Sequence, residues 1–188
     1  MNFREQTLEF TDKKIYYIDS KTGEEIQVMM DWEDELMKKS AEYVCENGGD
    51  ILEIGFGMGI SANYIQSHNI KSHTIIEYHP QVYNKAQIWA EDKPNVNLIL
   101  GDWKSSLNLL STYDGIFYDT FGDDNFKLFG DLIKDYVNEG ANVTWWNDCL
   151  EEKNIFGWDN VIYDWIPTKP TSNNYFKSSV YFLPKKKF

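Results

Sequence analysis

Leu52-Glu53-Ile54-Gly55-Phe56-Gly57-Met58-Gly59-Ile60 joins an apolar run to three glycines at alternate positions. Because glycine has no Cβ, a turn of this composition lets a ligand lie directly against the backbone. Glu77 comes twenty residues after Gly57, at the end of the next apolar run. A carboxylate at that place can accept hydrogen bonds from both hydroxyls of a ribose. The two features together predict a binding site for a nucleoside-containing cofactor.

Strand-like and helix-like patterns alternate from Asp50 onward. Strands are predicted at residues 51–54, 73–77, 96–100, 115–118 and 143–146, and helices at 32–46, at 61–67, from 80 onward and at 126–137. Residues 161–165 and 179–182 predict a final antiparallel pair. Such alternation is typical of an α/β fold with a parallel, doubly wound sheet and helices on both faces. Ligands bind these sheets at the carboxyl ends of the strands, so residues just after each strand are candidates for a site.

The first 31 residues have a different pattern. Residues 15–18 and 26–29 flank the turn-forming residues 19–23, which predicts a hairpin. We therefore divide the chain into an N-terminal appendage, residues 1–31, and a cofactor-binding domain, residues 32–188. Tyr16 and Tyr17 of the hairpin could belong to a lid that covers the site, or they could pack in the core.

Composition limits the function classes. The chain has 188 residues, enough for one domain, and a formal net charge of −12. Negative charge repels phosphate backbones and attracts cations, which argues against a nucleic-acid partner. No apolar run approaches the ~20 residues that span a bilayer, and the two cysteines, Cys45 and Cys149, form no CxxC pair, so we expect a cytoplasmic protein with no membrane partner. The basic run at 185–187 is interpreted as a solubilising tail.

Two cofactor classes use a glycine turn of this kind. The dinucleotide fingerprint requires a small residue where this chain has Ile60, which argues against NAD. The G-x-G-x-G spacing after an acid instead resembles motif I of the class I methyltransferases. In those enzymes adenine lies near the turn after the third strand, here Gly101-Asp102-Trp103, and the transferred methyl group lies near the residue after the fourth strand, here Asp119. Both places also have an ordinary interpretation, as a helix-capping turn and as a strand-end turn.

Four stretches are more specific. They are Val28 to Glu33 (VMMDWE), Leu52 to Ile60, Ile75 to Glu77, and Gly115 to Thr120 (GIFYDT). Together they resemble guanidinoacetate N-methyltransferase and its relative, the fungal arginine δ-N-methyltransferase. The resemblance implies a class I methyltransferase (Rossmann-like) fold, whose seven-stranded doubly wound sheet ends in an antiparallel hairpin. It also implies S-adenosyl-L-methionine as the cofactor and a guanidino nitrogen as the methyl acceptor.

The same resemblance assigns residues to the site. Glu33 and Asp119 are the catalytic pair that holds the guanidino group, and Asp119 takes the proton that the nitrogen must lose. Thr120, Asn147 and Asp148 complete the substrate site. The residues assigned to the cofactor are Met29, Met37, Gly55, Phe56, Gly57, Met58, Gly59, Ile60, Glu77, Tyr78, His79, Gly101, Asp102, Trp103 and Asp119.

The acceptor end departs from the family. In guanidinoacetate N-methyltransferase, backbone amides after an asparagine receive the substrate carboxylate, and Asn147 is the counterpart of that asparagine. Asp148, Glu151 and Glu152 follow it, and their negative charge disfavours a bound carboxylate. A more cationic small-molecule guanidine, or an arginine side chain, suits this rim better than guanidinoacetate.

Other functions remain open from the sequence. An enzyme of aminopropyl transfer to polyamines shares the fold and an acidic pocket, and a cofactor-binding module without catalysis would keep the glycine turn. His68, His73 and His79 lack the spacing of a metal site, so no metal is expected. DNA amino-methyltransferases carry a proline-proline-aromatic motif after the fourth strand, which is absent from Asp119-Thr120-Phe121. The oligomeric state is open, and a homodimer is one option.

Overall fold

The main sheet contains seven strands. The computed structural model describes residues 3–123, 125–149, 151–169 and 172–188. The strands are β4 (Asp50–Ile54), β5 (Ser72–Glu77), β6 (Val96–Leu100), β7 (Tyr113–Tyr118), β8 (Val137–Trp145), β9 (Ile162–Pro167) and β10 (Val180–Lys187). Their spatial order is β6-β5-β4-β7-β8-β10-β9; the strands from β4 to β8 are parallel, and β10 is antiparallel to both of its neighbours. The predicted doubly wound sheet with a C-terminal antiparallel hairpin is confirmed.

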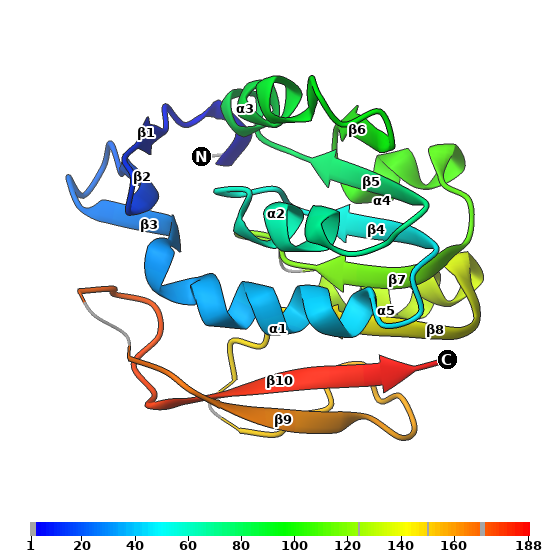
Figure 1. Cartoon of the computed structure of the whole chain (residues 1–188). Helices are drawn as coiled ribbons and strands as arrows, with labels where there is room; N and C mark the ends of the chain where they lie inside the picture. Colours follow the sequence, from blue (N-terminus) through cyan, green and yellow to red (C-terminus); the bar gives the residue numbers. More distant parts are fainter. Residues whose placement is uncertain (1–2, 124, 150, 170–171) are drawn as a thin grey trace.

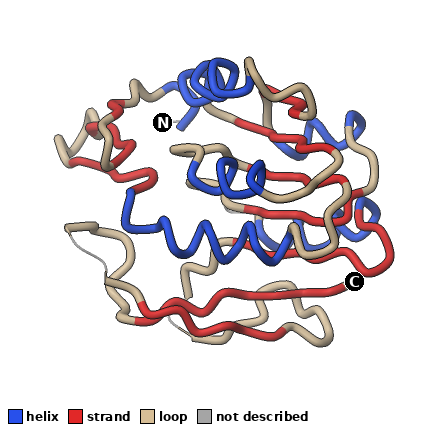
Figure 2. Tube along the Cα trace, in the orientation of Figure 1, coloured by secondary structure: helices blue, strands red, loops and turns tan. Residues whose placement is uncertain are grey.

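Helices cover both faces of this sheet (Figures 1 and 2). One face carries α1 (Asp34–Val44), α2 (Ile60–Ser67) and α3 (Pro80–Ala90), and the other carries α4 (Trp103–Ser106) and α5 (Phe126–Leu132). Alternate residues of β4 divide between these layers, because successive side chains of a strand point to opposite faces. Ile51 belongs to the core under α1 and Leu52 to the core under α5. Within the described residues, no helix is both long and apolar enough to cross a membrane.

Local sequence explains where two of the helices begin. Pro80 takes the first position of α3, where its missing N–H is not needed, and the Nδ1 atom of His79 accepts a hydrogen bond from the Gln81 N–H at 3.2 Å. A 3₁₀ turn, Asp31–Glu33, leads into α1. Glu33 therefore lies at the start of α1, which is the end of the helix nearest the carboxyl ends of the parallel strands (Figure 1). The other 3₁₀ turns are Phe3–Glu5, Leu107–Leu109 and Ile133–Tyr136.

A separate three-stranded antiparallel sheet precedes the main sheet. It contains β1 (Glu9–Phe10), β2 (Lys14–Ile18) and β3 (Glu25–Met30), of which β2 and β3 form the predicted hairpin. In the turn between them, Asp19 Oδ1 accepts hydrogen bonds from two backbone N–H groups. The small sheet lies on the side of the molecule that the carboxyl ends of the parallel strands face (Figure 1). Of the predicted appendage, Met1 and Asn2 lie outside the described residues.

The helix predicted over residues 126–137 is too long. α5 ends at Leu132, a 3₁₀ turn follows, and β8 begins at Val137, which pairs with Tyr113 of β7. The later residues of β8 are buried in the centre of the molecule. Pairing with β7 and burial therefore outweigh the local helical preference of this segment.

The basic run at 185–187 is not a tail, because it belongs to β10. Lys186 pairs with Val143 of β8 in the sheet. Lys185 Nζ lies 3.0 Å from Asp164 and 4.6 Å from the centre of the Tyr43 ring. A lysine can cover apolar surface with its aliphatic stem while its charge finds a partner, so a basic run is compatible with a sheet strand.

Candidate functional site

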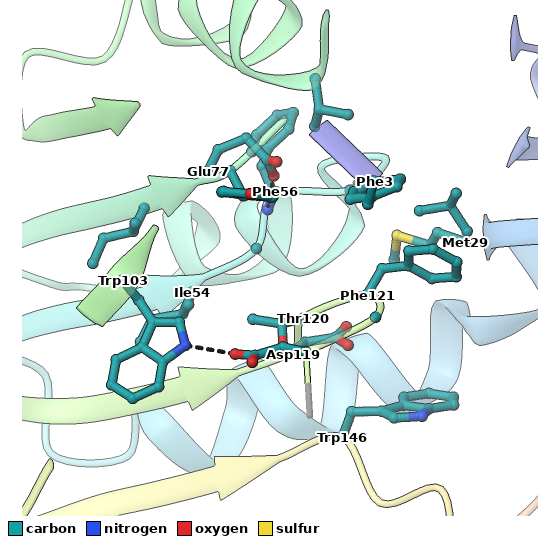
Figure 3. Close-up of a pocket in the computed structure, with 18 of the residues that line it drawn as sticks. Phe3, Met29, Ile54, Phe56, Glu77, Trp103, Asp119, Thr120, Phe121 and Trp146 are labelled. Atoms are coloured by element: carbon teal, nitrogen blue, oxygen red, sulfur yellow. Dashed lines mark hydrogen bonds between the residues drawn. The ribbon is translucent and has the colours of Figure 1, made fainter. Parts of the chain in front are cut away.

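The carboxyl ends of the parallel strands open into a cavity of about 570 Å³. Its walls come from the ends of β4, β5 and β7, from the loops after β6 and β8, and from β3 of the small sheet. Glu77 and Asp119 lie on opposite sides, with Trp103 toward one end and Met29 and Phe121 toward the other (Figure 3). Both the volume and the location are typical of a small-molecule site in a doubly wound sheet.

The glycine turn after β4 is pressed between two neighbouring segments. Gly55 has φ +96°, and a Cβ there would lie 1.9 Å from the backbone oxygen of Asp119. Gly57 has φ +54°, and a Cβ there would lie 2.4 Å from the sulfur of Met29. The conformation and the close approach both require glycine at these positions. A side chain at Gly55 would displace Asp119 from the cavity wall.

Backbone donors hold Glu77 at the end of β5. Its Oε2 accepts a hydrogen bond from the Phe56 N–H at 2.9 Å, and its Oε1 accepts one from the His79 N–H at 2.6 Å. Burial raises the pKa of Glu77, although these donors oppose the shift. The backbone N–H groups of Gly57 and Tyr78 also stabilise the ionised carboxylate, which lines the cavity beside the glycine turn.

The turn after β6 serves the fold and also lines the cavity. Asp102 caps α4, because its Oδ1 accepts a hydrogen bond from the Lys104 N–H at 2.8 Å. The capping interpretation of this turn is therefore correct, and Gly101, Asp102 and Trp103 all line the cavity as well. Asp123 Oδ2 accepts hydrogen bonds from Trp103 Nε1 at 2.6 Å and from the Tyr118 hydroxyl at 2.7 Å. Asp123 was not predicted, because no local motif marks it.

Two carboxyl groups, those of the buried Glu33 and the half-buried Asp119, share this cavity. Glu33 Oε1 accepts hydrogen bonds from the Met30 N–H at 2.8 Å and from the Tyr175 hydroxyl at 2.5 Å. Burial and the negative charge of Asp119 nevertheless raise the pKa of Glu33 to about 8. Burial and the charge of Glu53 raise the pKa of Asp119 to about 7. The site therefore holds two acids whose ionised forms a cation would stabilise.

Glu53 is a third buried acid, on the far side of the glycine turn. Its Oε2 lies 3.0 Å from His73 Nε2, and Ser61 Oγ donates a hydrogen bond to its Oε1. Both Glu53 and His73 are fully buried. Glu53, His73 and Ser61 thus connect β4 to β5 and to the start of α2.

Six residues assigned to the site do not line the cavity. They are Met37, Met58, Gly59, Ile60, His79 and Asn147. Met37 is buried in the core under α1, and the ring of His79 packs against Phe3 with 5.0 Å between centroids. The Asn147 side chain donates a hydrogen bond to the Phe182 carbonyl at 2.9 Å and so ties the end of β8 to β10. The other assigned residues line the cavity, and their roles toward a ligand stay predictions.

Aromatic side chains that were not predicted also line the cavity, among them Phe3, Phe121, Trp146 and Tyr175. Phe3 and Phe121 pack together with 4.8 Å between ring centroids, and Trp146 and Tyr175 with 6.5 Å. These residues lie in loops or short turns, or just after a strand, where no periodic pattern shows which way a side chain points.

Residues 7–168 match the model of the guanidinoacetate N-methyltransferase family. The chain belongs to this family. Protein arginine N-methyltransferase 2 of Yarrowia lipolytica is 40% identical over 137 residues, which cover 65% of this chain and 28% of that protein. Its namesake in Candida glabrata is 37% identical over 154 residues, covering 74% of this chain and 36% of that protein. The chain thus spans about a third of the length of these relatives.

Solved structures extend the comparison to the fold. Spermidine synthase from Thermotoga maritima superposes with a TM-score of 0.63, covering 96% of this chain and 72% of that chain, at 12% sequence identity. At this identity the likeness shows the fold alone. Together with the strand order and the family match, it establishes the class I methyltransferase fold.

The guanidinoacetate N-methyltransferase family implies S-adenosylmethionine as the cofactor, and the residues present fit it. The glycines leave the backbone of the turn bare at a place where a Cβ would collide with Asp119 or Met29. Glu77 lines the cavity beside that turn, where the hydroxyls of a ribose would lie. A sulfonium is a cation, and the nearby acids of the cavity suit its charge.

Proposed function

We propose that this chain is an S-adenosylmethionine-dependent N-methyltransferase that acts on the guanidino group of a small, arginine-like molecule. The observation that carries the proposal is the pair of carboxyl groups, of the buried Glu33 and the half-buried Asp119, in the cavity that the glycine turn bounds. Two neighbouring acids in a partly buried cavity are costly to ionise unless a cation compensates them. A guanidinium is planar and presents paired N–H donors, so two carboxylates can bind it through bidentate, charge-assisted hydrogen bonds.

The raised pKa values suit the proton transfer that methylation requires. When bound, the cofactor supplies an electrophilic methyl group on its sulfonium. Glu33 and Asp119 hold the acceptor nitrogen in a fixed orientation, which lowers the entropic part of the barrier. Asp119, whose pKa is raised to about 7, is a stronger base than an ordinary aspartate and takes the proton from the nitrogen. Phe3, Phe121 and Trp146 reduce the access of water.

The rim of the cavity favours a cationic acceptor over guanidinoacetate. Asp148 lines the cavity two residues after Trp146 in the chain, and its negative charge disfavours a substrate carboxylate. The named relatives are protein arginine methyltransferases, and a guanidino group on an aliphatic chain is common to arginine, agmatine and an arginine peptide. Among these, we expect agmatine and arginine to be preferred to guanidinoacetate.

The decisive experiment is incubation with methyl-labelled S-adenosylmethionine and guanidinoacetate, arginine, agmatine or an arginine-containing peptide. We expect S-adenosylhomocysteine and a methylated guanidine, with agmatine or arginine as the better acceptor. Glu33→Gln should lose acceptor methylation, whereas Glu35→Gln, the same change at an exposed position of α1, should not. Methylation of the peptide alone would replace the small-molecule acceptor by a protein. Turnover of decarboxylated S-adenosylmethionine alone would indicate aminopropyl transfer and overturn the proposal.

A further inference from the structure

The loop between β9 and β10 reaches the small N-terminal sheet. In Figure 1 this orange segment rises from the hairpin toward the end of β3. Gln27 of β3 accepts a hydrogen bond from the Asn174 N–H at 2.8 Å and donates one to the Ser172 carbonyl at 3.4 Å. Asn174 Nδ2 also donates to the Glu25 carbonyl at 3.2 Å. The loop is therefore fixed at the cavity, although the family match ends at residue 168 and assigns nothing to it.

Tyr175 of this loop lies at the mouth of the cavity. The residue is 39% exposed, yet its hydroxyl donates a 2.5 Å hydrogen bond to Oε1 of the buried Glu33. Its ring lies 5.8 Å from that of Trp32 and 6.5 Å from that of Trp146, centroid to centroid. Burial of the hydroxyl and the charge of Glu33 hold the pKa of Tyr175 well above its usual value, so the hydroxyl remains a donor. One side chain thus joins the outer surface to the acidic pair.

We propose that Tyr175 is a positioning residue for the acceptor: its hydroxyl orients Glu33, and its ring and that of Trp146 form an aromatic wall for a planar cation. This inference rests on the proposed function, because it concerns the acceptor end of the same site. A guanidinium stacks on aromatic faces while its edge binds carboxylates, which a compact ammonium group does less well. The wall therefore selects guanidines over primary amines.

The Tyr175 hydroxyl also favours the ionised form of Glu33, although burial and Asp119 oppose it. The groups that face Glu33 are Asp119 at the end of β7, Tyr175 from the loop and Tyr181 of β10. Asp119 raises the pKa of Glu33, whereas the Tyr175 hydroxyl lowers it by donating to the ionised form. Removing this hydroxyl should therefore make Glu33 hold its proton more tightly and bind a cation less well.

Tyr175→Phe tests the inference, because it removes the hydroxyl and keeps the ring. The matched control is Tyr163→Phe in β9, since the buried hydroxyl of Tyr163 has no hydrogen-bond partner in the part of the chain that the structure describes. Calorimetry should measure agmatine binding to both variants loaded with S-adenosylhomocysteine. We expect Tyr175→Phe to bind agmatine about 10- to 100-fold more weakly, as for a lost hydrogen bond to a charged group. Its affinity for S-adenosylhomocysteine should match that of wild type, which also shows that the variant is folded.

A second readout does not depend on any acceptor. Carbon-13 NMR of the Glu33 carboxyl, assigned with Glu33→Gln, should give a titration midpoint at higher pH in Tyr175→Phe than in wild type or Tyr163→Phe. In the Glu33→Gln background, Tyr175→Phe should have little further effect on agmatine binding. An unchanged midpoint together with unchanged agmatine affinity would overturn the inference. If wild type bound none of the guanidines, the proposed acceptor would be wrong, while the carboxyl titration would still decide whether Tyr175 acts on Glu33.

Discussion

Replacing Glu33 with glutamine should make the stability of the protein less dependent on pH. Glu33 is 3% exposed, and its pKa is raised from 4.5 to about 8. Glutamine keeps an oxygen that can accept the hydrogen bonds from the Met30 N–H and the Tyr175 hydroxyl. It has no charge to bury, so the variant isolates the cost of ionising the carboxyl inside the cavity.

The size of the effect follows from the shifted pKa. An acid whose pKa is higher in the folded state gives its full stabilisation below the unfolded pKa and loses it as the pH rises through the folded pKa. Each pH unit between these limits costs about 1.4 kcal/mol. Between pH 4.5 and pH 7, wild type should therefore lose about 3 kcal/mol that Glu33→Gln does not lose. In a chain of this length that difference corresponds to a change in Tm of about 6–12 °C.

Urea unfolding of wild type and Glu33→Gln at pH 4.5 and pH 7 measures this effect. The change in unfolding free energy between the two pH values is obtained for each protein, and the two changes are then compared. Glu35→Gln serves as the control, since it makes the same chemical change at an exposed position of α1. We expect the relative stability of Glu33→Gln to rise with pH and that of Glu35→Gln to stay constant. If Glu33→Gln shows the same pH dependence as wild type, then Glu33 is not a buried acid beside Asp119, and the charge argument for a cationic acceptor fails.

Three further outcomes are expected. Asp119→Asn should abolish methyl transfer, because the base is lost, while S-adenosylhomocysteine affinity measured by calorimetry stays within a few-fold of wild type; full turnover would show that another group takes the proton. Glu77→Ala should weaken S-adenosylhomocysteine binding by about 1–3 kcal/mol, and an unchanged Kd would remove Glu77 from the cofactor site. Gly55→Ala should destabilise the fold by at least about 1–3 kcal/mol in urea unfolding, because its φ of +96° and its contact with Asp119 exclude a side chain; wild-type stability would contradict the close approach.

The fold is predictable where the signal is local. Strands buried on both faces give continuous apolar runs, and β4 and β5 begin only one residue earlier than predicted. The edge strand β6 is found at both of its predicted ends. The beginning of β8 and the extent of β10 depend instead on pairing with distant strands. Such pairing overrides the composition of a segment, as the basic run in β10 shows.

The site residues likewise include some that local sequence predicts and some that it does not. Glu33, Glu77 and Asp119 belong to short motifs or strand ends, and the structure brings all three to one cavity. The position of Tyr175 depends on hydrogen bonds between its loop and Gln27, far away in the chain, so no local pattern could reveal it. Asn147 shows the opposite case. A motif assigned this residue to the substrate site, but its side-chain amide donates a hydrogen bond to the backbone of β10 instead of lining the cavity.

The position of β10 affects how the protein is made. This strand is inserted between β8 and β9 although both precede it in the chain. As the polypeptide leaves the ribosome, the edge of β8 therefore has unpaired backbone hydrogen-bonding groups until residues 180–187 emerge. Residues 162–167 likewise have no strand to pair with before that point. The loop with Tyr175 connects β9 to β10. Closure of the sheet and completion of the acceptor side of the cavity should thus occur together, once residues 180–187 have left the ribosome.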